Sequence, residues 1–173
     1  VKHFWERVRF YGATQSFTIG AMHMFLWNAP PRPDDADNPL RELQAVPMPT
    51  EIKEPFSQRF GVRILGQGLS QSEAMLILRQ DTRKRSGWPV GSCGNPVDGI
   101  DVRLADDAGN EVPVGEPGEL WVRPQRPFLI FNGYFDDPMA TASAFSGAWY
   151  KTGDMLRRDA EEMAKRMQFQ HAD

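Results

Sequence analysis

The stretch from Trp149 to Met155, WYKTGDM, places a carboxylate directly behind a glycine. Two aromatic residues and a lysine lead into Thr152, Gly153 and Asp154, a pattern typical of a strand that ends in a turn. The carboxylate of Asp154 offers two acceptor oxygens and a negative charge, so it either caps the turn or holds a ligand. Gly153 lets the backbone approach a ligand closely, because no Cβ stands in the way.

Three other segments combine glycines with polar side chains, and each has a structural explanation when taken singly. Gly66 and Gly68 fit a bulge where a strand leaves a sheet, and the glycines from residue 91 to 99 fit ordinary turns. Only the combination of all four segments bears on function. The segments are GQGLSQSE (66–73), GSCGNPVDG (91–99), GEPGELWVRP (115–124) and the stretch from 132 to 154 that ends in WYKTGD.

The length and charge of the chain limit the classes of protein to consider. Its 173 residues predict one domain, or one and a fraction, with enough chain to bury a core. Lys and Arg number 20 against 23 Asp and Glu, for a net charge of −3. This balance argues against a nucleic-acid partner, which requires a basic face. The short basic run at 83–85 is expected to be a solvated loop.

Cysteine usage and hydropathy give expectations about compartment and membranes. Cys93 is the sole cysteine, which fits a reducing, cytoplasmic environment, and we expect it to act as a buried small hydrophobic residue. No apolar run approaches the length of a membrane span, so no transmembrane segment is predicted. The first residues lack both an initiator Met and the layout of a signal peptide, so we expect the chain to begin within a longer protein.

The first half of the chain alternates predicted helices and strands, the order typical of a parallel sheet with crossover helices. Phe4, Val8 and Tyr11 share one face of the first helix, which Gly12 ends. The proline-rich and acidic segment from 30 to 39 is expected to be a loop. The predicted elements are helix 4–11, strand 13–19, helix 20–29, strand 40–46, helix 50–60 and strand 62–65.

From about Gly87 onward the pattern changes to short strands and tight turns, typical of an antiparallel sheet or a small barrel. Val102 and Leu104 share a face of one strand, and the segment 118–124 alternates in the next. Asp137 followed by a proline predicts the start of a short helix over 138–145. We therefore predict an α/β subdomain over 1–85, a β-barrel-like subdomain over 86–159 and an atypical helical tail over 160–173.

Taken together and in this order, the four segments resemble the adenylate-forming superfamily of acyl-CoA synthetases, aryl-CoA ligases, adenylation domains and luciferases. The resemblance is greatest to acyl-CoA synthetases of the crotonobetaine/carnitine-CoA ligase type, and it runs from about Phe4 to Asp159. It implies an α/β fold in which part of a parallel sheet with crossover helices joins a small antiparallel β-barrel subdomain. The matching residues are Gly118-Glu119-Leu120, Gly133-Tyr134, Pro138, Thr141, Phe145 and Tyr150-Lys151-Thr152-Gly153-Asp154.

The resemblance implies that ATP activates a small carboxylic acid as an acyl-adenylate, which coenzyme A then converts to a thioester. The implied cofactors and partners are ATP, Mg²⁺, coenzyme A as co-substrate and the acid. In this family the aspartate that corresponds to Asp154 accepts hydrogen bonds from both ribose hydroxyls. A carboxylate can grip a vicinal diol in this way through charge-assisted bonds. Tyr134 and Trp149 are expected to pack beneath the site.

The segment 66–73 falls where the family has an aromatic-glycine-x-threonine-glutamate motif. Gly68 and Ser70 match it, so the resemblance implies that Ser70 contacts the α-phosphate. Gln67 replaces the aromatic residue that packs on adenine, and Gln71 replaces the carboxylate that holds Mg²⁺. Glu73 points the same way as residue 71 in extended backbone and is our choice of metal ligand. Alternatively, Ser72 and Glu73 are the true hydroxyl–carboxylate pair.

Two further segments correspond to the adenine and acyl sites of the family. Ala45 and the two residues after it occupy the position of a glycine-rich turn beside adenine, which partly closes the narrow backbone approach. Gly20, Ala21 and Met22 fall where the family lines its acyl pocket, although the same pattern is also typical of plain core. His23 either faces a polar acyl group or is a helix histidine whose hydrogen bonds are satisfied within the protein, and we favour the second.

The resemblance also implies parts that this chain lacks. A phosphate-binding loop would precede Val1, and a small domain with a catalytic lysine would follow Asp159, so we expect little ligase turnover from this chain alone. The tail 160–173 is typical of a generic helix with pairs such as Glu161–Lys165. Two other interpretations are a degenerate, non-catalytic module for nucleotide or protein binding, and a fragment with no function of its own.

Overall fold

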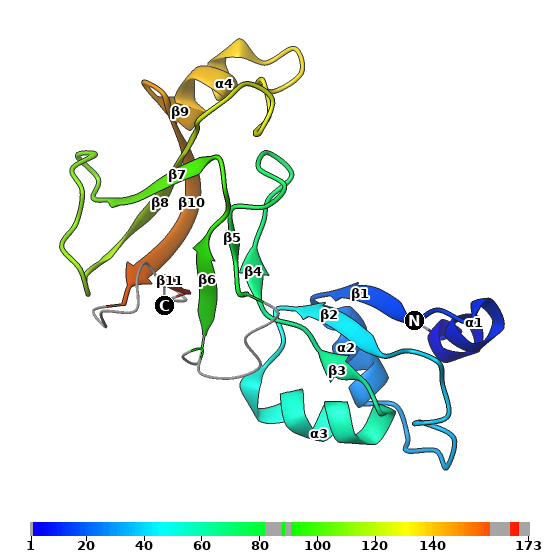
Figure 1. The fold of residues 1–173 in the computed structure, drawn as a ribbon. Coiled ribbons are helices and arrows are strands. Elements are labelled where there is room, and N and C mark those ends of the chain that lie inside the picture. The colour runs from blue at the N-terminus through cyan, green and yellow to red at the C-terminus, as the bar shows by residue number, and fades with distance from the viewer. Residues whose placement is uncertain (1, 82–87, 89–90, 160–166, 170–173) are drawn as a thin grey trace. The chain divides into compact units, whose positions relative to one another are not determined.

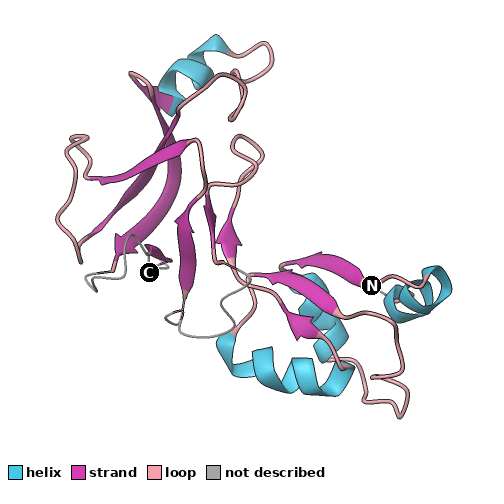
Figure 2. Cartoon of the chain, in the orientation of Figure 1, coloured by secondary structure: helices cyan, strands magenta, loops and turns pink. Residues whose placement is uncertain are grey.

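The computed structural model describes residues 2–81, 88, 91–159 and 167–169. The chain divides into two compact units, which we call unit 1 (Val1–Gln67) and unit 2 (Gly68–Asp173), and each is described by itself. Figure 1 labels the elements, and Figure 2 shows that helices are prominent in unit 1 whereas strands dominate unit 2. The basic run predicted to be a loop, 83–85, lies outside the described residues.

Unit 1 alternates helices and strands as the sequence predicts. Its strands pair in parallel in the order β1–β2–β3, with Thr18 opposite Ala45 and Leu43 opposite Ile64 (Figure 1). The elements are α1 (Phe4–Tyr11), β1 (Gln15–Ile19), α2 (Ala21–Trp27), β2 (Glu42–Val46), α3 (Thr50–Phe60) and β3 (Arg63–Ile64).

An aromatic core holds unit 1 together. Phe56 and Phe60 are buried on α3, four residues apart and so on one helix face, and their rings lie 4.6 Å apart. Trp5 of α1 stacks on Phe60 at 4.7 Å, which ties the two helices together. The helix ends at Gly61, whose φ of 65° is the left-handed conformation that a glycine adopts without strain.

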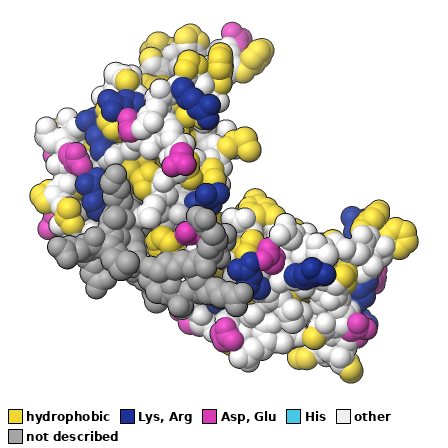
Figure 3. All heavy atoms as spheres, viewed as in Figure 1, with side chains coloured by type: hydrophobic (Ala, Val, Ile, Leu, Met, Phe, Trp, Pro, Cys, Tyr) yellow, Lys and Arg dark blue, Asp and Glu magenta, His cyan; other side chains and the backbone are white. Residues whose placement is uncertain are grey.

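The first helix buries only part of its predicted apolar face. Val8 is buried, but Tyr11 on the same predicted face is 75% exposed, so the unit covers only part of that face. Phe10 is exposed as well, and its ring meets Tyr11 edge-on. Figure 3 shows hydrophobic side chains open to solvent over this helix.

Arg59 anchors the proline-rich segment, which forms the predicted loop. The guanidinium donates to Asp35 at 2.7 Å and to the carbonyl oxygens of Trp27 at 2.6 Å and Ala29 at 2.9 Å. Asp35 also accepts from the backbone N–H of Arg32, so both partners of the ion pair have further hydrogen bonds. A segment without regular structure is thereby fixed to α3.

Unit 2 is built around an antiparallel sheet in the order β4–β5–β6–β11–β10–β8–β7, with β9 paired to β10. Its elements are β4 (Gly68–Leu69), β5 (Leu78–Arg79), β6 (Ser92–Pro96), β7 (Ile100–Ala105), β8 (Pro117–Pro124), α4 (Pro138–Ala144), β9 (Phe145–Ser146), β10 (Trp149–Arg158) and β11 (Met167–Phe169). The helix begins as predicted, because Asp137 caps it by accepting from the N–H of Ala140 at 2.8 Å.

The division between the units lies before the boundary predicted at residues 85 and 86. Strand β4 pairs with β5, and β5 pairs with β6, so the segment that contains β4 and β5 belongs to unit 2. The pairing explains Gly68, because a Cβ there would lie 2.7 Å from the carbonyl oxygen of Leu78.

Alternation along β7 and β8 fills the core of unit 2 as predicted. Leu104 lies opposite Leu120, and Val102 lies opposite Val122, with their side chains on the core face. Cys93 also belongs to this core, as expected. Of the predicted helical tail, residues 160–166 and 170–173 lie outside the described residues, and the three between them form β11 instead of helix. No helix in the described ranges has the length and hydropathy needed to cross a lipid bilayer.

Candidate functional site

The segment that carries Asp154 is a bulge within a strand, and the predicted turn at a strand end is wrong. Lys151 of β10 pairs with Trp121 of β8, but the next paired residue, Met155, lies opposite Glu119. The register shifts across the three residues between them. Gly153 has a φ of 78°, a conformation that glycine adopts without strain and that such a bulge requires.

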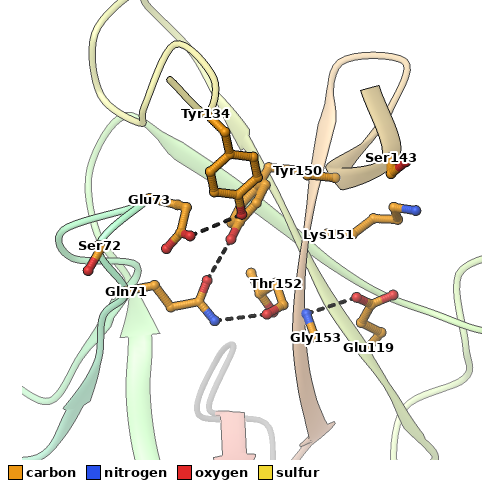
Figure 4. Close-up of a pocket in the computed structure, with 11 residues that line it drawn as sticks. Gln71, Ser72, Glu73, Glu119, Tyr134, Ser143, Tyr150, Lys151, Thr152 and Gly153 are labelled. Atoms are coloured by element: carbon orange, nitrogen blue, oxygen red, sulfur yellow. Dashed lines mark hydrogen bonds between the residues drawn. The ribbon is translucent and has the colours of Figure 1, made fainter. Parts of the chain in front are cut away.

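A cavity of about 630 Å³ opens beside this bulge in unit 2. Its lining comes from the loop after β4, from β8, from the segment around α4 and from β10, so residues far apart in sequence meet there (Figure 4). The lining residues are Gln71, Ser72, Glu73, Glu119, Tyr134, Ser143, Ala144, Tyr150, Lys151, Thr152 and Gly153.

Gln71 links the loop after β4 to the bulge through every polar atom of its amide. Its Nε2 donates to the Asp154 carboxylate at 2.7 Å and to the Thr152 carbonyl at 2.9 Å. Its Oε1 accepts from the Tyr150 hydroxyl at 2.9 Å (Figure 4). Residue 71 therefore approaches Asp154 as a neutral donor, where the resemblance places a second carboxylate.

The Asp154 carboxylate is half-buried and is not among the lining residues, although its partner Gln71 and its neighbour Gly153 are. Burial raises the pKa of Asp154, the hydrogen bond from Gln71 lowers it, and the negative charge of Glu119 raises it further. The net direction is upward, so Asp154 takes up a proton at a higher pH than an ordinary aspartate. The sequence identified Asp154 and Gln71 as candidate site residues, and in the structure a hydrogen bond connects their side chains.

Two tyrosines next to Gln71 serve as hydrogen-bond donors. Tyr134 donates to Glu73 at 3.0 Å, and this bond is the main cause of its raised pKa. Burial and then the charge of Glu73 raise the pKa of Tyr150 well above its usual value. Both hydroxyls thus stay protonated at neutral pH. Tyr134 lines the cavity, although it was expected to pack beneath the site.

Three functional candidates in the cavity were not identified from the sequence. Glu119 accepts from the Gly153 N–H and from the Trp121 indole, each at 2.8 Å. Lys151 presents an ammonium that makes no hydrogen bond or ion pair to the rest of the described chain. Tyr150 completes the Gln71 network. All three belong to segments that carry the resemblance, but their contacts become visible only in the folded structure.

Of the two residues predicted to hold Mg²⁺, Gln71 fits that ion poorly, whereas Glu73 keeps one carboxylate oxygen that could bind it. The oxygen of Gln71 already accepts from Tyr150, and a neutral amide is a weaker ligand than a carboxylate. One oxygen of Glu73 accepts from Tyr134. Within the described part of the chain, no three His, Cys, Asp or Glu side chains gather to form a metal site.

Of the two serines, only Ser72 lines the cavity with Glu73. Ser70 is exposed and follows β4 directly, outside the set of lining residues. The cavity thus favours the second arrangement considered from sequence, in which Ser72 and Glu73 are the hydroxyl–carboxylate pair.

The remaining predicted residues lie in unit 1, except Gly68, which begins unit 2. Ala45 is fully buried within β2, so the chain turns only after that strand ends. Gln67 donates to the Ala45 carbonyl at 3.1 Å and accepts from the Met48 N–H at 3.0 Å, which uses its amide within unit 1.

Gly20 precedes α2, and Ala21 and Met22 are exposed in its first turn. Met22 borders an apolar cavity of about 460 Å³ that Phe4, Val8 and Tyr11 also line. His23 is buried and satisfied as expected. Its Nε2 lies 2.8 Å from the Pro47 carbonyl, and its Nδ1 lies 3.3 Å from the Thr18 hydroxyl.

Comparison with known proteins bears on the family. The sequence model of the AMP-binding enzyme family matches residues 1–135. The chain belongs to this family. It is 36% identical over 158 residues to a medium/long-chain-fatty-acid–CoA ligase of Mycobacterium marinum, a match that covers 91% of this chain and 30% of the relative. A crotonobetaine/carnitine–CoA ligase of Salmonella arizonae is 33% identical over 161 residues, which are 91% of this chain and 31% of the relative.

Solved structures agree with this membership at the level of the fold. The benzoate CoA ligase of Burkholderia xenovorans superposes with a TM-score of 0.80 at 24% identity, over 97% of this chain and 33% of that one. The Brucella canis acyl-CoA synthetase also gives 0.80 at 24% identity, over 99% and 31%. The chain thus spans about a third of the length of the proteins that it matches.

Proposed function

We propose that this chain carries the site that binds the ribose of the nucleotide in an ATP-dependent acid–CoA ligase. The acid's carboxylate oxygen would bond to the α-phosphorus of ATP as the bond to pyrophosphate breaks. The thiol sulfur of coenzyme A would then bond to the acyl carbon as AMP leaves. The relatives are ligases for fatty acids and for crotonobetaine or carnitine, which supports a carboxylic acid as substrate.

The observation that carries the proposal is the hydrogen bond that holds the Asp154 carboxylate to Gln71, a residue that lines the cavity. Gln71 occupies one side of Oδ2, which leaves Oδ1 and the second lone pair of Oδ2 as acceptors. These positions suit the neighbouring hydroxyls of ribose. Because the carboxylate is half-buried and already oriented, a sugar that binds there meets a charge with little reorganisation to complete.

The other assignments extend this proposal. Ser72, or Ser70 as the resemblance implies, would donate its hydroxyl to the α-phosphate. Three residues belong to the segments that correspond to the adenine site of the family. They are Ala45 and Gln67 in unit 1 and Gly68 in unit 2. Gly20, Ala21 and Met22 would line the acyl site, which is supported by the apolar cavity that Met22 borders. Single Ser70→Ala and Ser72→Ala variants separate the two hydroxyls.

We also propose that the chain by itself binds nucleotide but turns over little substrate. The relatives that it matches are about three times longer, and transfer at a phosphorus atom needs preorganised cations around the phosphates. Among the lining residues of the cavity, Lys151 supplies one such charge. Robust pyrophosphate release from this chain with ATP, Mg²⁺ and a panel of carboxylic acids would contradict this part.

The test is calorimetric titration of the chain with a 5′-O-(N-acylsulfamoyl)adenosine, a non-hydrolysable mimic of an acyl-adenylate. We expect saturable binding that Asp154→Ala weakens about tenfold or more, as for loss of a charge-assisted bond. Asp107→Ala removes an exposed carboxylate from a turn in unit 2 and is the matched control. Absence of binding to every variant would instead favour a degenerate, non-catalytic module.

A further inference from the structure

The bulge in β10 leaves three residues without regular ladder partners on β8. Thr152, Gly153 and Asp154 lie between the paired positions Lys151 and Met155, where the register shifts. Gly153 has no side chain to hold its backbone, and glycine adopts positive and negative φ about equally well. The direction in which this segment presents Asp154 therefore depends on what else binds the bulge.

Side chains supply the missing hydrogen bonds. The Thr152 hydroxyl donates to the Leu120 carbonyl at 2.8 Å and accepts from the Asp154 N–H at 3.1 Å. Glu119 Oε1 accepts from the Gly153 N–H at 2.8 Å (Figure 4). Two β8 positions thus hold the bulge at consecutive residues, one through its backbone and one through a carboxylate.

Glu119 is itself fixed on its other side. Its Oε2 accepts from the Trp121 indole Nε1–H at 2.8 Å, and Trp121 is only 5% exposed. The Arg103 guanidinium lies 4.5 Å from the Trp121 ring and 4.6 Å from the Trp149 ring. Arg123 lies 4.7 Å from the same Trp149 ring. This stack of two indoles and two guanidinium groups supports the carboxylate from the outer face of the sheet.

We propose that Glu119 is a positioning residue for nucleotide recognition, which holds the Gly153 amide and so fixes the bulge that presents Asp154. The proposal rests on the proposed function for its nucleotide part. The structural part requires only that a carboxylate at residue 119 satisfy two donors at once. A glutamine is nearly the same size but brings an NH₂ group, which must face either the Gly153 N–H or the Trp121 indole N–H.

The experiment compares the chain with its Glu119→Gln variant by amide hydrogen exchange and by calorimetric titration with AMP. We expect the Gly153 amide to exchange about tenfold faster and AMP to bind about tenfold more weakly in the variant. The Gly153 amide and Trp121 indole signals should shift together in nitrogen–proton NMR spectra. Glu116→Gln, at an exposed position just before β8, makes the same charge change and should alter none of these.

A rescue variant separates positioning from general stability. In Trp121→Phe the indole donor is absent, so a glutamine at 119 can turn its oxygen to Gly153 without opposing a second N–H. The combined Trp121→Phe and Glu119→Gln variant should therefore recover slower Gly153 exchange and tighter AMP binding than Glu119→Gln alone. A merely structural role predicts faster Gly153 exchange and weaker AMP binding in the double variant than in Glu119→Gln alone, because the destabilising effects of the two substitutions would add.

Two results would overturn the proposal. One is a Gly153 exchange rate in Glu119→Gln equal to that in Glu116→Gln. The other is faster exchange with unchanged AMP affinity, which would show that the bulge does not govern recognition. Failure of the unsubstituted chain to bind AMP would contradict the proposed function and the nucleotide part, while the exchange rate would still decide whether Glu119 holds the bulge.

Discussion

Unit 1 and unit 2 use buried and half-buried polar groups in different ways. In unit 1 two of these groups hold backbone segments in place. Arg59 anchors a loop through carbonyl oxygens and Asp35, and Gln67 joins two backbone groups across the chain. In unit 2 the polar side chains bind one another around an open cavity, with Gln71 between Asp154 and Tyr150.

The two glutamines make the difference specific. Both replace residues that the resemblance places in the nucleotide site, an aromatic at 67 and a carboxylate at 71. Gln67 is occupied by backbone partners of unit 1, whereas Gln71 holds the side chain proposed to bind ribose. We therefore expect substitutions of polar or core residues in unit 1 to change stability, and those around the cavity to change nucleotide affinity.

The largest expected effect is on the aromatic core of unit 1. Phe56→Ala removes a fully buried ring that contacts Phe60 and Trp27, and should lower the free energy of unfolding by about 3–5 kcal/mol. Urea denaturation followed by circular dichroism measures this. Phe10→Ala, at an exposed ring in the same unit, should cost less than about 0.5 kcal/mol. Equal losses in both variants would contradict the described core.

The next effect concerns the ion pair that anchors the loop. Asp35→Ala leaves the Arg59 guanidinium without its carboxylate at a largely buried position, and should cost about 3 kcal/mol of unfolding free energy. The same urea titration applies, with exposed Asp37→Ala as control. A loss of AMP binding free energy as large as the loss of unfolding free energy would contradict the expectation that polar groups of unit 1 serve stability and not nucleotide binding.

Around the cavity we expect the opposite result. Gln71→Ala removes the donor that holds Asp154, so AMP affinity should fall about tenfold while the free energy of unfolding changes by less than about 1 kcal/mol. Exposed Gln58→Ala is the control. Since the Gln71 hydrogen bond lowers the pKa of Asp154, its loss should raise that pKa. The pH below which AMP binding is lost should then be higher in the variant, which titrations at several pH values would detect.

The smallest effect is a pH dependence from His23. Burial lowers the pKa of this histidine below 6.5, so the folded state binds fewer protons than the unfolded chain. The free energy of unfolding should be highest above pH 6.5 and should decline as the pH falls below that value. His23→Gln should flatten the decline, whereas exposed His3→Gln should leave it. Urea titrations across this pH range measure the decline in the free energy of unfolding. An equal decline in the His23→Gln variant would contradict the prediction.

Much of the fold follows from local sequence patterns. Alternating periodicity, the Gly61 helix end and the Asp137 cap predict elements that the structure contains, because these signals act over a few residues. The unit boundary and β11 are set by strand pairing between distant segments, which no local pattern reports. Helical periodicity places Tyr11 on the same face as Val8, but it does not report how much of that face is covered.

The candidate site was predictable in part for a similar reason. Asp154 and Gln71 stand out by residue type and by resemblance. The role of Glu119 depends on the register shift in β10, and the role of Tyr150 depends on the loop after β4, which brings Gln71 to its hydroxyl. The Mg²⁺ assignment to Gln71 and Glu73 rested on the resemblance and on residue spacing, which do not report the hydrogen bonds that these side chains accept from Tyr150 and Tyr134.

The most direct test of the central claim compares the binding of two nucleotides, with and without the ribose hydroxyls, to two proteins. Calorimetric titrations with AMP and with 2′,3′-dideoxy-AMP would be run on the chain and on its Asp154→Ala variant. We predict that the unsubstituted chain binds AMP about tenfold or more tightly than the dideoxy analogue, and that the variant binds both equally weakly. Equal discrimination by the two proteins would show that Asp154 does not bind the ribose hydroxyls.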